Sequence, residues 1–368
     1  MIPVYIGTYT DGASQGIYRL ELDHANARLS TPMLVAKAVN PSFLAWHPGQ
    51  PVLYAVSETN TVGAGKTGAL LAYRVGADGS LALINEEPSG GANPCFVSVH
   101  PAGTHAFVAN YSAGSVAVFP IRPDGGVSAA SAVAQHAGSS VHPTRQKRPH
   151  AHAVRTASGD AFVVATDLGA DRLFVYRFDA QRGTLTPNEP PSAVLSAGSG
   201  PRHFAEHPSG DAVFLINELT STIVSYAWDS AHGTLELRAT ISTLPPGFAG
   251  ADLNTAGEVA VHPSGRFVYG SNRGHDSIAA FHVNEDRTLT RVDIYPAGGK
   301  TPRHFAVDPG GGFLLAANQE SHSLVLFRIE QETGALIDTG ARASAPSPAF
   351  VGMPLPRGRR VTSGSSRQ

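Results

Sequence analysis

The chain has 368 residues, a net charge of −2 from 27 basic and 29 acidic side chains, and a charged fraction of only 15%. A balance this close to neutral does not predict nucleic acid or an anionic membrane surface as a partner. The single cysteine, Cys95, excludes an intramolecular disulfide. It lies in the apolar run PCFVSV, where we expect a buried side chain rather than a nucleophile.

The N-terminal residues MIPVYIGTYT carry neither a basic leader nor a long apolar core, so we expect no signal peptide. No apolar run approaches the roughly 20 residues that cross a bilayer, and we expect a cytoplasmic protein. The 39 glycines and 27 prolines predict many short elements joined by tight turns. Because no window keeps a helical period, we expect an all-β fold.

From residue 41 onward one pattern recurs at intervals of roughly 45 to 55 residues, the range of propeller blades. Each copy places a tight turn between two apolar runs: HPGQ at 47, HPAG at 100, ASGD at 157, HPSG at 207 and 262, and DPGG at 308. The copy over residues 203–241 divides into four short strands, HFAEH, AVFLIN, IVSYAW and LELRATI. Four such strands, joined by short turns, predict one antiparallel sheet per copy.

The seventh copy is divided between the two ends of the chain. The predicted first strands begin near Pro41, Pro94, His150, Arg202, Glu258, Arg303 and Pro348. The last copy runs out after SPAFVGMPL, while VYIGTY, GIYRLELD and LSTPMLVAKA at the N-terminus supply its other three strands. The sequence therefore predicts a seven-bladed β-propeller of four-stranded antiparallel blades over residues 1–356, closed by N- and C-terminal strands, and a disordered basic tail over 357–368.

Up-and-down order within a blade fixes which loops share a face of the ring. The segments that enter the first strand and the loops between the second and third strands lie at one end, and the His-Pro turns lie at the other. The first group contains the candidates for chemistry: Arg145, His150, His152, Arg202, His203, Asn217, Glu218, Glu258, Arg273, Arg303, His304 and Gln319. We expect them around a channel mouth, where propellers bind ligands.

Purely structural interpretations of these residues stay open. The histidines of the His-Pro turns recur with the turn and are expected to be structural. Asn217 has the place of an asparagine that ends several second strands, where the amide commonly bonds backbone. Arg202-His203 and Arg303-His304 can share a repeat origin, and Glu218 with Arg273 can form a plain salt bridge.

Several segments, taken in order, resemble the seven-bladed lactonase family: RQKRPHAHAV, DLGADR, GPRHFAEHPSG with NEL, GEVAVHPSGRFVYGSNR, and TPRHFAVDPGGGFLLAANQES. This family includes bacterial 6-phosphogluconolactonases and fungal 3-carboxy-cis,cis-muconate lactonizing enzymes. The resemblance implies a site built from one histidine, one glutamate and two arginines, which match His150, Glu218, Arg202 and Arg273. It implies no cofactor and no metal, although His150, His152, Asp167 and Glu218 offer donor atoms.

The resemblance implies hydrolysis of a sugar lactone, with 6-phospho-D-glucono-1,5-lactone converted to 6-phosphogluconate in the pentose phosphate pathway. Glu218 or His150 would activate water, Arg202 and Arg273 would stabilise the oxyanion, and Arg145, Lys147 and Arg303 would hold phosphate. The other substrate contacts are expected from His152, His203, Asn217, Glu258 and Gln319. Two alternatives stay open, a carboxymuconate cycloisomerase and a propeller that binds a ligand or protein without turnover, and so does the oligomeric state.

Overall fold

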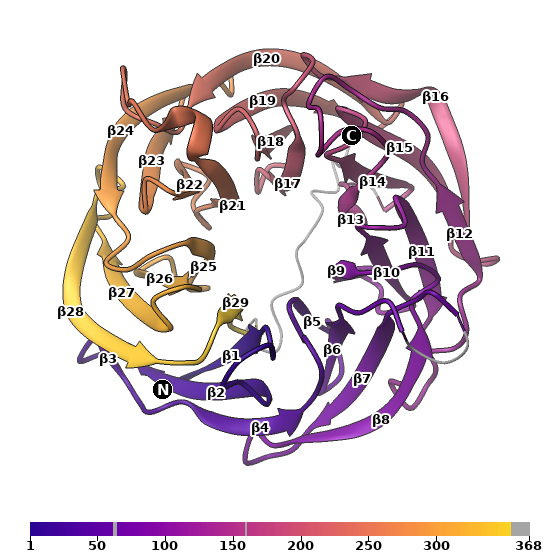
Figure 1. Cartoon of the computed structure of the whole chain (residues 1–368), viewed down its shortest axis with the longest axis horizontal. Coiled ribbons are helices and arrows are strands. Elements are labelled where there is room, and N and C mark those ends of the chain that lie inside the picture. The colour runs from indigo at the N-terminus through magenta and orange to yellow at the C-terminus, as the bar shows by residue number, and fades with distance from the viewer. Residues whose placement is uncertain (62–64, 159, 355–368) are drawn as a thin grey trace, which may run out of the picture.

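A computed structural model describes residues 1–61, 65–158 and 160–354, and the basic tail expected over 357–368 lies outside them. Seven antiparallel sheets stand around a central axis as the blades of a ring (Figure 1). The 3-10 helix Ala251–Leu253 is the one helical element among the described residues, so none of their helices is long and apolar enough to cross a membrane. The prediction of a seven-bladed, all-β propeller is confirmed.

The strands follow one another from the channel outward in each blade. Blade 1 comprises β5 (Leu44–Trp46), β6 (Val52–Ser57), β7 (Ala69–Val75) and β8 (Leu81–Pro88). Blade 2 comprises β9 (Pro94–Val99), β10 (His105–Asn110), β11 (Ser115–Pro120) and β12 (Ala132–Gln135). Blade 3 comprises β13 (Ala151–Thr156), β14 (Phe162–Asp167), β15 (Arg172–Asp179) and β16 (Thr184–Val194). Blade 4 comprises β17 (Pro201–Glu206), β18 (Ala212–Asn217), β19 (Thr222–Asp229) and β20 (Thr234–Ser242).

The remaining three blades complete the ring. Blade 5 comprises β21 (Thr255–Val261), β22 (Phe267–Arg273), β23 (Ser277–Val283) and β24 (Leu289–Pro296). Blade 6 comprises β25 (Pro302–Val307), β26 (Phe313–Asn318), β27 (Ser323–Ile329) and β28 (Leu336–Ser344). Blade 7 comprises β29 (Pro348–Gly352), β1 (Ile2–Thr8), β2 (Gly16–Asp23) and the two short strands β3 (Arg28–Leu29) and β4 (Met33–Lys37).

Blade 7 joins the two ends of the chain, as the sequence predicts. The C-terminal strand β29 pairs antiparallel with β1, so that Ile6 lies opposite Val351. The outer strand, expected as one run, is divided into β3 and β4, which both pair with β2. The interruption contains Pro32, which has no N–H to donate to a sheet. Pairing of the two termini closes the ring and removes a free inner edge.

Burial along the strands follows their distance from the axis. The second strands of five blades, with the sequences VLYAVS, HAFVAN, FVVATD, AVFLIN and FLLAAN, are buried at every residue. They lie between two strands of their own blade and between the faces of neighbouring blades, which favours continuous apolar runs. Outer strands such as β12 alternate between exposed and half-buried residues, as a sheet with one wet face does.

The innermost strands share a feature that the sequence did not predict. In β9, β13, β17, β25 and β29 the pairing register shifts near the start of the strand, so that the second residue is left out of the ladder. The residues at this bulge are Cys95, His152, Arg202, Arg303 and Ala349. A β-bulge re-aims the side chain it carries. The repeated bulge therefore sets a ring of side chains around the channel mouth.

Candidate active site

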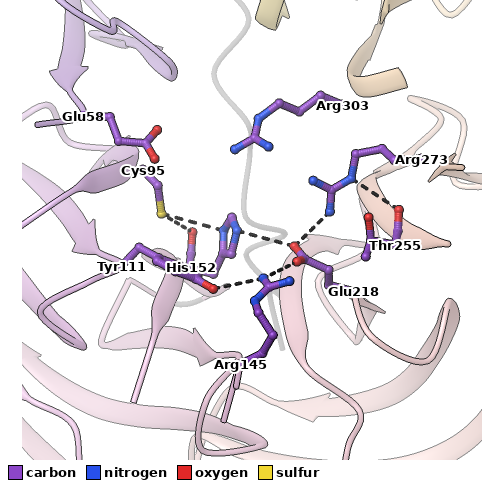
Figure 2. A pocket seen from close by; sticks show the side chains of 9 residues that line it. All are labelled: Glu58, Cys95, Tyr111, Arg145, His152, Glu218, Thr255, Arg273 and Arg303. Atoms are coloured by element: carbon purple, nitrogen blue, oxygen red, sulfur yellow. Dashed lines mark hydrogen bonds and ion pairs between the residues drawn. The ribbon is translucent and has the colours of Figure 1, made fainter. Parts of the chain in front are cut away.

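A pocket of about 360 Å³ opens at the end of the channel opposite the His-Pro turns. Its lining comes from blades 1 to 6 and from the loop between blades 2 and 3 (Figure 2): Glu58, Cys95, Tyr111, Arg145, His152, Glu218, Thr255, Arg273 and Arg303. The volume lies within the range of small-molecule sites. Two carboxylates and three guanidinium groups in one concave space require specific pairing, because unpaired buried charges are costly.

Two positions of the repeat supply most of this lining. The bulged second residue of the inner strand gives Cys95, His152 and Arg303. The residue at the end of the second strand, or directly after it, gives Glu58, Tyr111, Glu218 and Arg273. Residues far apart in the chain therefore meet because they occupy equivalent places in different blades.

Glu218 is the centre of the charged cluster and is only 3% exposed. Arg145 Nη2 donates to Oε1 of its carboxylate at 2.5 Å, and Arg202 Nε donates to Oε2 at 3.1 Å. Arg273 Nη2 lies 2.9 Å from the same Oε2. Three guanidinium groups from separate segments thus converge on one buried carboxylate.

The arginines determine the protonation state of Glu218. Burial by itself would raise the pKa of this carboxyl, but the surrounding cations, led by Arg273 and Arg202, outweigh it and hold the pKa well below its usual range. Burial in turn lowers the pKa of Arg273 to about 10, although Glu218 opposes this shift. Both groups are therefore ionised at neutral pH.

The neighbouring imidazole belongs to His152. Its Nε2 lies 3.8 Å from Glu218 Oε2, and its Nδ1 lies 3.8 Å from Cys95 Sγ. Burial, followed by the charges of Arg202 and His203, holds the pKa of His152 well below its ordinary value. Burial also raises the pKa of the Cys95 thiol, so the pair consists of a neutral imidazole and a protonated thiol.

A second polar group lies on the wall formed by blades 1, 6 and 7. Glu58 Oε2 accepts hydrogen bonds from the Tyr9 hydroxyl at 2.8 Å and from the Ser42 hydroxyl. Arg303 Nη2 donates to the Tyr9 hydroxyl at 2.7 Å and its guanidinium lies 5.0 Å from the centre of the Tyr9 ring. Burial raises the pKa of Glu58, although Arg303 opposes the shift.

Arg202 lies behind the pocket and supports Glu218. Its Nη1 donates to the carbonyl of Gly257 at 2.8 Å, and a Cβ at Gly257 would lie 2.6 Å from Ser271 Oγ. Gly200, just before the strand, has a φ of +64°, a left-handed conformation that glycine adopts without strain. The carbonyl of Gly200 accepts the N–H of Glu218 at 2.7 Å. These glycines allow the close backbone approach that brings Arg202 and Glu218 together.

His203 and Glu258, expected among the substrate contacts, form a layer behind the pocket lining, in contact with Arg202 and, through His203, with the ring of His152 at 5.0 Å between ring centres. His203 Nδ1 lies 2.7 Å from Glu258 Oε2, and His304 Nε2 lies 3.1 Å from the same oxygen. Both rings pack edge-on against Phe43, 5.6 Å between ring centres. This buried layer separates the charged pocket from the apolar interior.

Besides Arg202, His203 and Glu258, three further predicted residues lie outside the set that lines the pocket. His150 stacks on the Tyr111 ring at 4.5 Å, and its Nδ1 lies 3.1 Å from the Tyr111 carbonyl oxygen. Asn217 donates from Nδ2 to the side-chain hydroxyl of Thr222 at 3.0 Å, whereas its structural interpretation expected a bond to backbone. Gln319 donates its backbone N–H to the carbonyl of Thr301 at 2.9 Å.

His150 and His152 are two residues apart, and the structure places them differently. The strand begins only at Ala151, and its register shifts between Ala151 and Ala153. His152 is therefore the imidazole that the structure brings to Glu218.

Sequence reasoning missed Glu58, Tyr111, Thr255 and Tyr9. The first two occupy the same place after a second strand as Glu218, and Tyr9 follows β1 in the same way. The equivalence of Glu218 and Arg273 was visible in the sequence, so extending that position to all seven copies would have found three of the four. Thr255, at the start of β21, gave no comparable signal.

The described residues contain no group of three or more His, Cys, Asp or Glu side chains placed to hold a metal ion. Asp167, one of the donors considered, accepts the N–H groups of His150 and Ala170 through Oδ1. Its Oδ2 lies 2.7 Å from His136 Nδ1. These contacts engage both carboxylate oxygens of Asp167, which is not among the residues that line the pocket.

A closed ring of seven sheets with a buried carboxylate, three arginines and a neutral imidazole at one end defines a propeller with a polar small-molecule site. The model of the lactonase, 7-bladed beta-propeller family matches residues 3–353, and the chain belongs to this family.

Relatives match over nearly the whole chain. A 6-phosphogluconolactonase of Bacillus subtilis (strain 168) is 37% identical over 349 residues, 94% of this chain and 97% of that protein. A 6-phosphogluconolactonase of Formosa agariphila is 30% identical over 339 residues, 90% of this chain and 94% of that protein. The structure of a periplasmic gluconolactonase of Pseudomonas aeruginosa superimposes with a TM-score of 0.90 at 33% identity and covers 96% of this chain and 98% of that one.

Proposed function

We propose that this protein hydrolyses a sugar lactone, and that its substrate is 6-phospho-D-glucono-1,5-lactone, opened to 6-phosphogluconate. The names of the relatives support the reaction. The observation that supports a phosphorylated substrate is the surplus of positive charge in the pocket. Three arginines line the pocket with two glutamates, and Arg202 lies directly behind them. Such a surplus favours a substrate that brings its own negative charge.

His152 takes the proton from the attacking water in this proposal. Its lowered pKa keeps the ring neutral at neutral pH, so a ring nitrogen is available to accept a proton, whereas both carboxylate oxygens of Glu218 are already engaged by arginines. Glu218 Oε2 lies 3.8 Å from Nε2 and stabilises the imidazolium as it forms. A positioned base of this kind contributes about 10²- to 10⁴-fold to the rate.

The arginines divide between the oxyanion and the phosphate. Arg273 is 12% exposed in its side chain and is fixed by the carbonyls of Thr255 and Ala256, which suits a preorganised donor to the oxyanion. Arg145 is 36% exposed and lies on a loop, so it can exchange one carboxylate oxygen of Glu218 for a substrate phosphate. Arg303 faces the same space and adds a second cation for that phosphate.

The test compares 6-phosphogluconolactone with unphosphorylated gluconolactone. The wild type is expected to have the higher kcat/KM for the phosphorylated lactone, and Arg145→Gln is expected to reduce that preference about 10- to 100-fold, the weight of one charged hydrogen-bond pair. Arg287→Gln, which breaks an ion pair with Asp211 at the opposite end of the ring, is the matched control. Equal kcat/KM for the two lactones in the wild type would refute the phosphate assignment.

His152→Gln tests the base independently of the substrate. Turnover of either lactone is expected to fall about 10²- to 10⁴-fold while KM changes little. Near-normal turnover in both His152→Gln and Glu218→Gln would refute the proposed roles of these two residues. His150→Gln then shows whether the imidazole that stacks on Tyr111 has any part in the reaction.

The same assays test the two alternative functions, a cycloisomerase and a binding platform. A carboxymuconate cycloisomerase would also use arginines for carboxylates, so carboxymuconate is assayed beside the lactones. A binding platform without turnover commonly presents large aromatic anchors, whereas the described lining residues include one tyrosine, Tyr111, and neither phenylalanine nor tryptophan. The cytoplasmic location stays a prediction for cell fractionation to test, since the Pseudomonas relative is described as periplasmic.

A further inference from the structure

Glu58 faces the pocket from the side opposite Glu218. It follows β6 of blade 1, whereas Glu218 follows β18 of blade 4, three blades away around a ring of seven. Both side chains line the same pocket, and Figure 2 shows them on different sides of His152. A substrate between them therefore meets one carboxyl group on each side.

The two carboxyl groups have opposite surroundings. Glu218 accepts from or pairs with three guanidinium groups, whereas the described hydrogen bonds of Glu58 come from two neutral hydroxyls, those of Tyr9 and Ser42, and both end on Oε2. Charged groups near Glu58 are Arg303 of β25 and Arg202 of β17, with the protonated thiol of Cys95 on β9 beside the same pocket. Arg303 reaches the group through the Tyr9 hydroxyl rather than by a direct pair.

Lactone hydrolysis needs a proton at a second place. Attack of water on the carbonyl carbon requires a base, and cleavage of the ring C–O bond produces an alkoxide, which is a poor leaving group unless it is protonated. An ionised carboxyl that stabilises the charge of the base on one side of a site, and a protonated carboxyl on the other side, is an arrangement that divides base and acid roles. Burial raises the pKa of Glu58, while the arginines lower the pKa of Glu218, so Glu58 holds a proton more readily than Glu218 does.

We propose that Glu58 is the general acid that protonates the ring oxygen as it leaves the carbonyl carbon, an inference that rests on the proposed lactone hydrolysis. Water adds to the carbonyl carbon and gives one proton to His152, and the oxyanion that forms is held by Arg273. The ring C–O bond then breaks, its electron pair goes to the ring oxygen, and that oxygen takes the proton of Glu58.

The products are a carboxylic acid and a free hydroxyl. The new acid ionises, and proton exchange with solvent returns a proton to Glu58 and removes one from His152, so the net reaction consumes one water and releases one proton. The hydroxyls of Tyr9 and Ser42 donate to the Glu58 carboxylate left after transfer, and Arg303 stabilises its charge through Tyr9. Such bonds to a carboxylate favour its formation.

The decisive experiment varies the leaving group and keeps the sugar. Glucono-1,5-lactone expels an alkoxide, whereas its 5-thio analogue expels a thiolate, which is a much weaker base (the cysteine thiol has a pKa of about 8.5) and leaves without a proton donor. Glu58→Gln is expected to lower kcat on the oxygen lactone about 10²- to 10⁴-fold and on the thiolactone less than about 10-fold, with KM little changed on both. Glu218→Gln is the comparison, since it acts on the attack step and is expected to slow both substrates alike.

Control variants separate acid catalysis from structure. Glu206→Gln removes another carboxyl whose pKa is raised by burial, at the opposite end of β17, where it accepts the N–H of Ser158. It is expected to leave both rates unchanged. Tyr9→Phe, which weakens the support of the Glu58 carboxylate without touching the carboxyl itself, is expected to give a smaller loss that is again selective for the oxygen lactone.

Each result decides the matter. Equal losses on both lactones in Glu58→Gln, or no loss on the oxygen lactone, would overturn the acid role. If Glu58→Gln fails to fold, the selectivity of Tyr9→Phe decides in the same way. Absence of turnover of every lactone by the wild type would instead refute the proposed hydrolysis, so the two failures are distinguishable.

Discussion

The inner strands carry histidines at both ends, and the two ends use them differently. At the end of the His-Pro turns, three imidazoles lie close to the glycine carbonyl of the next blade's turn, with Nε2 to oxygen distances of 3.1, 3.1 and 2.8 Å for His47 with Gly103, His207 with Gly265, and His262 with Gly311. At the pocket end, the neighbours are charged side chains: Glu218 for His152, and Glu258 for His203 and His304.

This contrast separates structural residues from candidates for chemistry. The recurring histidines His47, His207 and His262 meet the same backbone group, because the ring repeats its backbone geometry. At the bulge of the inner strand the residue type changes from blade to blade, and each side chain meets different neighbours. The residues at this position are Cys95, His152, Arg202 and Arg303. A position of the repeat at which the residue type is not repeated is therefore a stronger indication of a functional site than a residue type taken alone.

The largest effect that this contrast predicts is at Glu218. Glu218→Gln removes the negative charge that three arginines share, so we expect turnover to fall by at least about 10²-fold and the protein to be destabilised by about 3–5 kcal/mol, the effect of breaking a buried ion pair. Steady-state kinetics and denaturant unfolding measure the two losses.

The matched change at the other end is Asp211→Asn. Asp211 pairs with Arg287 at 2.9 Å, but it is 53% exposed, and exposed pairs contribute little. We expect less than about 1 kcal/mol of destabilisation and unchanged turnover. A similar loss of activity from both variants would mean that the two ends are not functionally distinct.

The sequence was sufficient to predict the ring and the shared face of the candidates, because both follow from the spacing of strands and turns. It was not sufficient to choose between His150 and His152, since alternation fails at a bulge that leaves no mark in the residue pattern. Glu58 was missed for another reason: Ser57-Glu58 lacks the asparagine that precedes Glu218 and Tyr111, although its position in the blade is the same. Local motifs identify repeated residues, whereas side-chain direction depends on the register of the ladder.

An intermediate effect concerns the pH dependence of stability. Burial lowers the pKa of His304 to about 4, although Glu258 opposes the shift. The folded state therefore binds a proton less readily than the unfolded chain, whose histidines titrate near 6.5, so the stabilisation is present above pH 6.5 and is lost as the pH falls towards 4. For His304 this loss amounts to about 2 kcal/mol between pH 7.5 and pH 5.

Urea unfolding of the wild type and of His304→Gln at these two pH values measures that contribution. The variant is expected to start less stable at pH 7.5 because its contact with Glu258 is changed, and to lose about 2 kcal/mol less than the wild type on acidification. The same loss in both proteins would show that the buried layer under the pocket does not account for acid sensitivity. Part of the wild-type loss persists in the variant, because burial also lowers the pKa of His203.

Among the histidines, the smallest effect is expected at the His-Pro turns. His207→Ala removes an imidazole whose Nε2 lies 3.1 Å from the Gly265 carbonyl oxygen and whose Nδ1 accepts the N–H of Ser209. Each such hydrogen bond contributes about 1 kcal/mol, so we expect a destabilisation of about 1–2 kcal/mol in denaturant unfolding. Turnover at a temperature well below the unfolding transition is expected to stay within twofold of the wild type, because Glu206 at the turn end and Arg202 at the pocket end lie at opposite ends of the same strand. A larger fall in kcat would show that the turns transmit their geometry along β17 to the bulge at Arg202, and the periodic histidines would then be part of the site's support.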